Sequence, residues 1–222
     1  AIFAGCGLGK TFIQLEWARN VPGNILVLAP LAVSQQTIRE GEKLRIEVKY
    51  CRRKEQVNSK ITITNYEMLH KFDPSRFNGI VLDESSVMKN FAGSTRNLII
   101  ESFAKTPFRL ACTATPAPND YMELGNHAEF LGIQSRSEML SMFFVHDGGE
   151  TSKWRLKGHA EEEYWRWLAS WAVMMQKPSD LGYDDNGFIL PKLNYFEHVI
   201  DNNSGNNFSL FGKEAKTLLE RR

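Results

Sequence analysis

Short apolar runs with β-branched residues recur along the first half of the chain, and stretches that favour helix separate most of them. The apolar runs predict strands, because buried strands are short apolar segments bounded by turn residues. They occupy residues 25–29, 46–50, 61–64, 80–82 and 108–112. The stretches that favour helix occupy residues 11–20, 32–44, 66–72 and 95–103. This alternation is typical of a parallel sheet with helices on both faces, so the pattern predicts an α/β fold.

From residue 121 onward the pattern is mainly helical. It predicts one long helical region over residues 121–144, a glycine-containing turn at 147–149, and a second helix over residues 159–175. Trp167 and Trp171 stand four residues apart, and therefore lie on one face of the second helix. We interpret the tryptophans of this helix as the aromatic core of a helical subdomain. The alternative is a platform on which the bases of a single strand stack.

Composition excludes some classes of protein and leaves nucleic-acid binding open. No apolar run approaches the roughly 18 residues that a membrane-spanning helix needs, so we expect no membrane association. The net charge of +1 provides no overall attraction to phosphates, so any binding to nucleic acid must come from a local surface. The three cysteines, Cys6, Cys51 and Cys112, form no CxxC pair. They argue against disulfides and a zinc site, and they fit a reducing, cytoplasmic setting.

A glycine-rich segment lies between a strand fragment and an amphipathic helix, which is where a phosphate-binding loop must lie. Glycines let successive backbone N–H groups turn toward a phosphate, and the positive end of the following helix points to the same place. Lys10 can then reach the β- and γ-phosphates, and the Thr11 hydroxyl can coordinate magnesium. Ala4 replaces the first glycine of the general pattern, and an ordinary turn is the alternative. The expected nucleotide-binding residues are Gly5, Cys6, Gly7, Leu8, Gly9, Lys10 and Thr11.

Two adjacent carboxylates follow the strand predicted at 80–82. Magnesium on ATP needs an oxygen ligand from the protein, and the attacking water needs a base or an orienting carboxylate. We assign Asp83, together with Thr11, to the metal and Glu84 to the water, so the expected catalytic residues are Lys10, Asp83 and Glu84. A carboxylate pair after a strand also occurs as the cap of a following helix. The phosphate loop makes the catalytic interpretation the more specific one.

The strand predicted at 108–112 leads into small hydroxyl residues and then a proline. In a doubly wound sheet the carboxyl ends of the strands line the ligand crevice. Thr113 and Thr115 are therefore expected near the carboxylates, where they could hydrogen-bond Glu84 and couple its state to other parts of the protein. The alternative for this segment is an ordinary turn.

Five segments follow one another in the order of motifs I, Ia, Ib, II and III of superfamily 2 helicases. They are AGCGLGKT (4–11), LVLAP (26–30), ITNYEML (63–69), LDESS (82–86) and LACTATPAPNDYMEL (110–124). The chain resembles the Swi/Snf-type branch, and particularly the DEAD/DEAH-box-like helicases of phages and prophages. The resemblance implies a RecA-like P-loop NTPase fold with an appended helical subdomain, and ATP and Mg²⁺ as cofactors. It also implies ATP hydrolysis coupled to movement on nucleic acid, with DNA favoured over RNA.

The resemblance also assigns candidate contacts to the nucleic-acid backbone, which are Pro30, Thr64, Asn65 and Tyr66. Taken singly, each could equally be a strand end or a helix cap. Two features of the family are missing from this sequence. The arginine pair that usually lies near Gln176 is absent, and no adenine-recognising motif precedes the phosphate loop.

We expect residues 1–134 to form a RecA-like lobe that begins inside a strand, residues 135–185 a helical subdomain, and residues 186–222 a linker toward a second RecA-like lobe. On this interpretation the chain binds nucleotide weakly and hydrolyses it slowly, because the arginine finger belongs to the second lobe. Two other functions stay open. One is a different P-loop ATPase motor, and the other is a scaffold that binds nucleotide without catalysis.

Overall fold

The structure, a computed structural model, describes residues 1–89, 93–147, 150–188 and 191–197. The chain divides into two compact units, Ala1–Phe188 and Ile189–Arg222. The described residues of the second unit, 191–197, form neither helix nor strand. Most of the predicted linker therefore lies outside the described residues, and all the helices and strands below belong to the first unit.

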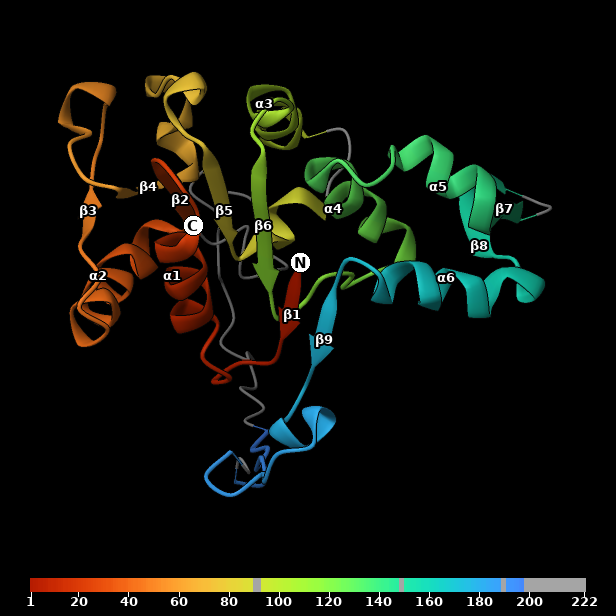
Figure 1. Cartoon of the computed structure of the whole chain (residues 1–222). Coiled ribbons are helices and arrows are strands. Elements are labelled where there is room, and N and C mark those ends of the chain that lie inside the picture. Colours follow the sequence, from red (N-terminus) through yellow and green to blue (C-terminus); the bar gives the residue numbers. More distant parts are fainter. Residues whose placement is uncertain (90–92, 148–149, 189–190, 198–222) are drawn as a thin grey trace, which may run out of the picture. The chain divides into compact units, whose positions relative to one another are not determined.

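A sheet of seven parallel strands forms the centre of the first unit, in the order β3-β4-β2-β5-β6-β1-β9 (Figure 1). The carboxyl ends of parallel strands meet at one edge of the sheet, which brings the ends of β1, β5 and β6 together. This sheet confirms the predicted α/β fold. The strands are β1 (Ile2–Ala4), β2 (Ile25–Ala29), β3 (Val48–Tyr50), β4 (Ile61–Asn65), β5 (Gly79–Asp83), β6 (Phe108–Thr113) and β9 (Val173–Met175).

Helices cover both faces of the sheet, because successive residues of each central strand point to opposite faces and both sets are apolar. On β2, Val27 belongs to the core that contains Leu15 and Ala18 of α1. Leu28, the next residue, belongs to the core on the other face, with Phe103 of α3. The helices are α1 (Lys10–Asn20), α2 (Ser34–Lys43), α3 (Ser94–Phe103) and α4 (Leu124–Leu131). The helix predicted at 66–72 is a 3₁₀ helix, Tyr66–Lys71.

The region predicted as helical over residues 121–144 is mostly helical, but it is divided into separate helices. Gly132 ends α4 in the left-handed conformation, with φ of 72°, which glycine adopts without steric cost. Ser135 then starts a new helix through a capping box with Glu138. The segment consists of a 3₁₀ turn (Tyr121–Glu123), α4, α5 (Arg136–Phe143) and the start of strand β7 (Phe144–Asp147). The turn predicted at 147–149 includes residues 148 and 149, which lie outside the described residues.

The helix predicted for residues 159–175 is correct only in its first part. Helix α6 spans Glu161–Ala169, and residues 173–175 form strand β9 instead. Strand β9 pairs in parallel with β1, with Val173 opposite Ile2. The backbone of β1 would have unpaired N–H and C=O groups on this side if residues 173–175 were helical. Pairing with β1 therefore outweighs the local helical pattern of these residues. Residues 135–185 thus also contribute a strand to the sheet, while the domain bounds stay a prediction.

The remaining part of the first unit packs around one buried tyrosine. Strands β7 and β8 (Glu150–Leu156) form an antiparallel hairpin beside α5 and α6. Tyr164 of α6 is fully buried, and its ring contacts Phe143, Phe144 and Trp167. Trp167 and Trp171 meet edge to face at 5.1 Å between ring centroids. The tryptophans of α6 and the segment after it are partly buried and pack against this core, which supports the interpretation as aromatic core.

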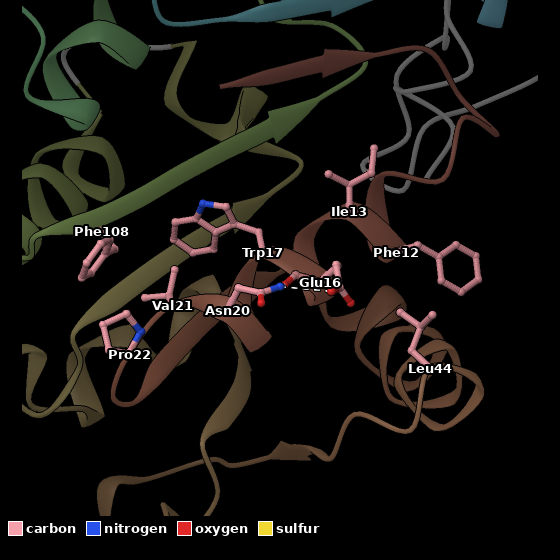
Figure 2. Close-up of a pocket in the computed structure, with 9 residues that line it drawn as sticks. All are labelled: Phe12, Ile13, Glu16, Trp17, Asn20, Val21, Pro22, Leu44 and Phe108. Atoms are coloured by element: carbon pink, nitrogen blue, oxygen red, sulfur yellow. Dashed lines mark hydrogen bonds between the residues drawn. The ribbon is translucent and has the colours of Figure 1, made fainter. Parts of the chain in front are cut away.

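Helix α1 also has an apolar outer side. Ile13 and Trp17, one turn apart, line an open groove of about 790 Å³ with Phe12 (Figure 2). Gln14, in contrast, points into the protein and is 1% exposed. Gln14 thus lies on the buried side of the helix together with Leu15 and Ala18. In the described part of the chain, no helix is both long and apolar enough to cross a membrane.

Candidate functional site

Residues 5–9 join β1 to α1 at the carboxyl edge of the sheet. Gly7 and Gly9 have φ of 81° and 75°, a region in which a Cβ atom would be strained. Among the described residues no side chain caps α1, and its first turn contains no acidic residue. The backbone N–H groups at the start of α1 therefore lack helical partners, and its positive end is not neutralised. This geometry suits an anion, as predicted for a phosphate loop.

Lys10, the first residue of α1, folds its side chain back over this loop. Its Nζ donates to the carbonyl oxygens of Ala4 at 2.8 Å and Gly5 at 3.0 Å. An anionic phosphate accepts hydrogen bonds more strongly than a neutral carbonyl. The Lys10 ammonium can therefore exchange these two carbonyl partners for the oxygens of a phosphate bound in the loop. Thr11 follows on the first turn, where its side chain is half-buried. Cys6 and Leu8 lie in the loop, and Cys6 is exposed.

Asp83 ends β5 and is 7% exposed. Its Oδ1 accepts a hydrogen bond of 2.8 Å from Gln14 Nε2. Burial raises the pKa of the Asp83 carboxyl, and the Gln14 hydrogen bond and the charge of Lys10 oppose this effect. A buried carboxylate with this little compensation favours a cation beside it.

Glu84 is held by two hydroxyl groups. Its Oε1 accepts hydrogen bonds from Ser86 at 2.8 Å and from Thr113 at 2.7 Å. The backbone of Glu84 has φ of 55°, a conformation that is uncommon for a residue other than glycine and marks a strained position. The Thr113 hydroxyl in turn accepts from the backbone N–H of Thr115 at 3.1 Å. The structure thus places Thr113 beside Glu84, and Thr115 contributes through its backbone.

The candidate nucleic-acid contacts are mostly buried. Thr64 is fully buried, and Asn65 and Tyr66 are 4% and 8% exposed. The Tyr66 hydroxyl donates to the backbone oxygen of Asp83 at 2.7 Å, and burial raises the pKa of this phenol well above its usual value. Tyr66 therefore supports the end of β5, and its hydroxyl is not available to a polymer in this conformation. Burial likewise argues against a direct contact from Thr64, whereas Pro30 is half-buried at the end of β2.

Sequence reasoning did not identify Gln14, Ser86 or the pair formed by Ser85 and His127. His127 Nε2 lies 3.0 Å from Ser85 Oγ, and both side chains are fully buried. Burial lowers the pKa of His127 to about 4, so the imidazole is neutral at physiological pH. The position of Gln14, one helical turn after Lys10, is a signal that the sequence does contain.

The donor set of the site fits magnesium carried by a nucleotide. Mg²⁺ usually keeps water and phosphate ligands and takes only one or two from the protein. The Asp83 carboxylate and the Thr11 hydroxyl are groups of this kind. The described residues contain no cluster of three or more His, Cys, Asp or Glu that could hold a metal ion by themselves.

A model of the family described as "Type III restriction enzyme, res subunit" matches residues 1–118. Among solved structures, the chain is similar to the SWI2/SNF2 ATPase core of Sulfolobus solfataricus in complex with double-stranded DNA. The TM-score is 0.63 at 21% identity, over 83% of this chain and 41% of that chain. A second similar structure is the Hef helicase domain of Pyrococcus furiosus, with a TM-score of 0.47 at 19% identity, over 60% of this chain and 33% of that chain.

The similarity to the SWI2/SNF2 core confirms a RecA-like fold for this chain, which spans about two fifths of that core. No curated protein sequence matches the chain. The match to the family model includes the loop at 5–11, the carboxylates at 83 and 84, and Thr113 and Thr115.

Proposed function

The chain belongs to the family of the res subunit of type III restriction enzymes, and we propose that it is the ATP-binding lobe of a nucleic-acid-dependent ATPase that couples Mg-ATP hydrolysis to movement on DNA. One observation carries the proposal. A glycine loop, the amine of Lys10, a buried carboxylate and a carboxylate held by hydroxyl groups all lie at the carboxyl edge of one parallel sheet. Ligands of open α/β sheets bind at such an edge.

Each group has a role that follows from its surroundings. The N–H groups of residues 5–11 and the Lys10 ammonium bind the phosphates of ATP. Thr11 and Asp83 hold Mg²⁺, which neutralises charge on the phosphates when bound. Glu84 orients the attacking water and accepts its proton, and Thr113 fixes the Glu84 carboxylate for that task.

The partners follow from the family and the fold together. The SWI2/SNF2 core was solved with double-stranded DNA, which supports DNA over RNA and movement along a duplex over strand separation. A second RecA-like lobe of the same protein completes the site and supplies an arginine finger. Thr113 and Thr115 couple the ATP site to the nucleic acid. Pro30 contacts the nucleic-acid backbone at the carboxyl edge of the sheet. A cytoplasmic setting and a phage or prophage origin stay predictions.

Two other functions remain as alternatives. A different P-loop motor would share Lys10, Asp83 and Glu84, but the segments at 63–69 and 110–124 favour the helicase type. A nucleotide-binding scaffold would not need Glu84 held in a strained conformation by two hydroxyl groups, since strain of this kind is concentrated at functional sites.

The test compares nucleotide binding and hydrolysis by the 222-residue chain. We expect weak binding of ATP with Mg²⁺, slow hydrolysis, and no stimulation by DNA. A protein that also contains the second lobe should be faster by about 10³- to 10⁵-fold when DNA is present. Lys10→Ala should abolish binding, whereas Lys43→Ala, at an exposed lysine of α2, should not. Undiminished binding by Lys10→Ala would support the scaffold, and a full, DNA-stimulated rate in the single lobe would contradict the two-lobe proposal.

A further inference from the structure

Gln14 is a polar residue on the buried side of α1. Its side chain is 1% exposed, while Ile13 and Trp17 of the same helix line the open groove on the outer side (Figure 2). Burial of an amide is unfavourable unless its donors and its acceptor have partners. An apolar side chain would suit the buried position better, so the partners of Gln14 indicate why an amide is there.

The partner of this amide lies at the end of β5, a strand that carries the site. Gln14 Nε2 donates to Asp83 Oδ1 at 2.8 Å. Because a carboxylate only accepts hydrogen bonds, the Gln14 amide must present its NH₂ group to Asp83. Gln14 therefore connects α1 to the end of β5.

The other end of the amide has an unused acceptor. Gln14 Oε1 is buried and has no hydrogen-bond partner among the described residues. Buried acceptors of this kind are rare in folded proteins. The hydrogen bond to Asp83 is thus the contact that accounts for a buried amide at this position.

We propose that Gln14 is a positioning residue, whose amide holds the Asp83 carboxylate in the orientation in which it binds Mg²⁺. The inference rests on the proposed function, in which Asp83 is the magnesium ligand. The terminal torsion of an aspartate has a broad preference, and the hydrogen bond to Oδ1 restricts it. Lys10 and Gln14 lie one turn apart on α1, so a single helix contacts the phosphates and orients the metal ligand.

The experiment measures how much Mg²⁺ strengthens the binding of a slowly hydrolysed ATP analogue. Calorimetric titrations with Mg²⁺ and with a chelator give two affinities, and their ratio reports the metal alone. Gln14→Met keeps the length of the side chain but donates no hydrogen bond. We expect this variant to lower the ratio by about tenfold, and to leave the affinity in chelator unchanged. Binding of Mn²⁺ to the nucleotide complex, followed by electron paramagnetic resonance, should weaken by the same factor.

A matched control is Thr62→Val, which also removes a buried hydrogen-bonding group but lies on β4, outside the proposed site. It should leave the ratio unchanged. If Gln14→Met does not fold, Gln14→Asn carries the same expectation, because its shorter side chain cannot reach Asp83. A normal ratio in a folded Gln14 variant overturns the positioning role and leaves the proposed function intact. A wild-type chain that binds no nucleotide with Mg²⁺ overturns the proposed function, and this inference with it.

Discussion

The hydroxyl of Thr113 donates a hydrogen bond of 2.7 Å to Glu84 Oε1, which connects the end of β6 to the end of β5 through side chains. The same hydroxyl accepts from the N–H of Thr115. The segment that follows β6 is thereby joined to the carboxylate proposed to act on water. A displacement of that segment changes the position of Glu84 without any contact to the nucleotide.

Replacing Thr113 by valine tests this connection. The side chain keeps its shape and loses the donor, so Glu84 is held by Ser86 alone. Hydrogen bonds to charged groups contribute about 1.5–3 kcal/mol, and we expect the ATPase rate to fall by about tenfold with nucleotide affinity unchanged. The comparison is Thr115→Val, which keeps its backbone N–H and should retain most activity. Equal rates in both variants would show that the hydroxyl of Thr113 has no role.

The left-handed conformation of Gly9 gives a second prediction. Alanine at this position is strained by about 1–2 kcal/mol, and the strain falls where the loop meets α1. Gly9→Ala should lower the free energy of unfolding by that amount and weaken ATP binding. Gly158→Ala is the control, because a Cβ there meets no atom within 4 Å and its φ is not positive. Denaturant titration measures the free energy of unfolding, and a binding titration measures the affinity for ATP. If Gly9→Ala and Gly158→Ala gave the same values for both, the left-handed conformation of Gly9 would have no role in stability or binding.

The third prediction concerns acid stability and His127. Burial lowers the pKa of His127 from 6.5 to about 4 in the folded chain. Between these values the unfolded chain binds a proton at this residue and the folded chain does not, so the folded state loses stability as the pH falls. The loss from this residue approaches about 1.4 kcal/mol per pH unit. At pH above 6.5 the contribution of His127 no longer changes with pH.

His127→Gln should remove this part of the pH dependence. Unfolding free energies at pH 7.5 and pH 4.5 give the comparison, with the exposed His159→Gln as the control. The control should lose as much stability on acidification as the wild type. An unchanged loss in His127→Gln would mean that the pKa of His127 is the same in the folded and the unfolded chain.

The fourth prediction concerns the start of α5. The Ser135 hydroxyl accepts from the N–H of Glu138, whose side chain accepts from the N–H of Ser135. Ser135→Ala should lower the free energy of unfolding by about 1 kcal/mol. The control is Ser141→Ala, which removes a hydroxyl that donates a hydrogen bond to a backbone carbonyl within the same helix. This variant should lower the free energy of unfolding by less. A smaller loss for Ser135→Ala than for Ser141→Ala would contradict the capping role.

The sequence contained enough information for the central strands but not for the edge of the sheet. Residues 25–29 are apolar on both faces, which a buried parallel strand requires, and β2 has these bounds. The strand predicted at 46–50 begins at Val48, because Arg45 adopts a left-handed conformation and the N–H of Ile46 bonds Gly41. Strand β9 depends on pairing with β1, which is distant in sequence, so local pattern could not reveal it.

The residues of the candidate site likewise include some that the sequence predicts and others that only the packing reveals. Asp83 and Thr113 end strands and Lys10 follows the loop after β1, so strand order brings these residues together at one edge. Gln14 was missed because its role depends on which side of α1 faces β5. The position of Tyr66 within a motif gave no information about burial, and only the packing shows its hydroxyl bonded to Asp83.

The pairing of β9 with β1 has a consequence for the order of folding. The N–H of Gly5 bonds the carbonyl of Met175, so the first residue of the phosphate loop is held by a strand that is synthesised much later than the loop. Contacts this distant in sequence form slowly, because a long loop must close first. On the ribosome, the loop therefore emerges before β9 and lacks this hydrogen bond until β9 has been made. A chain stopped before residue 173 should expose the edge of β1, which is a site for aggregation.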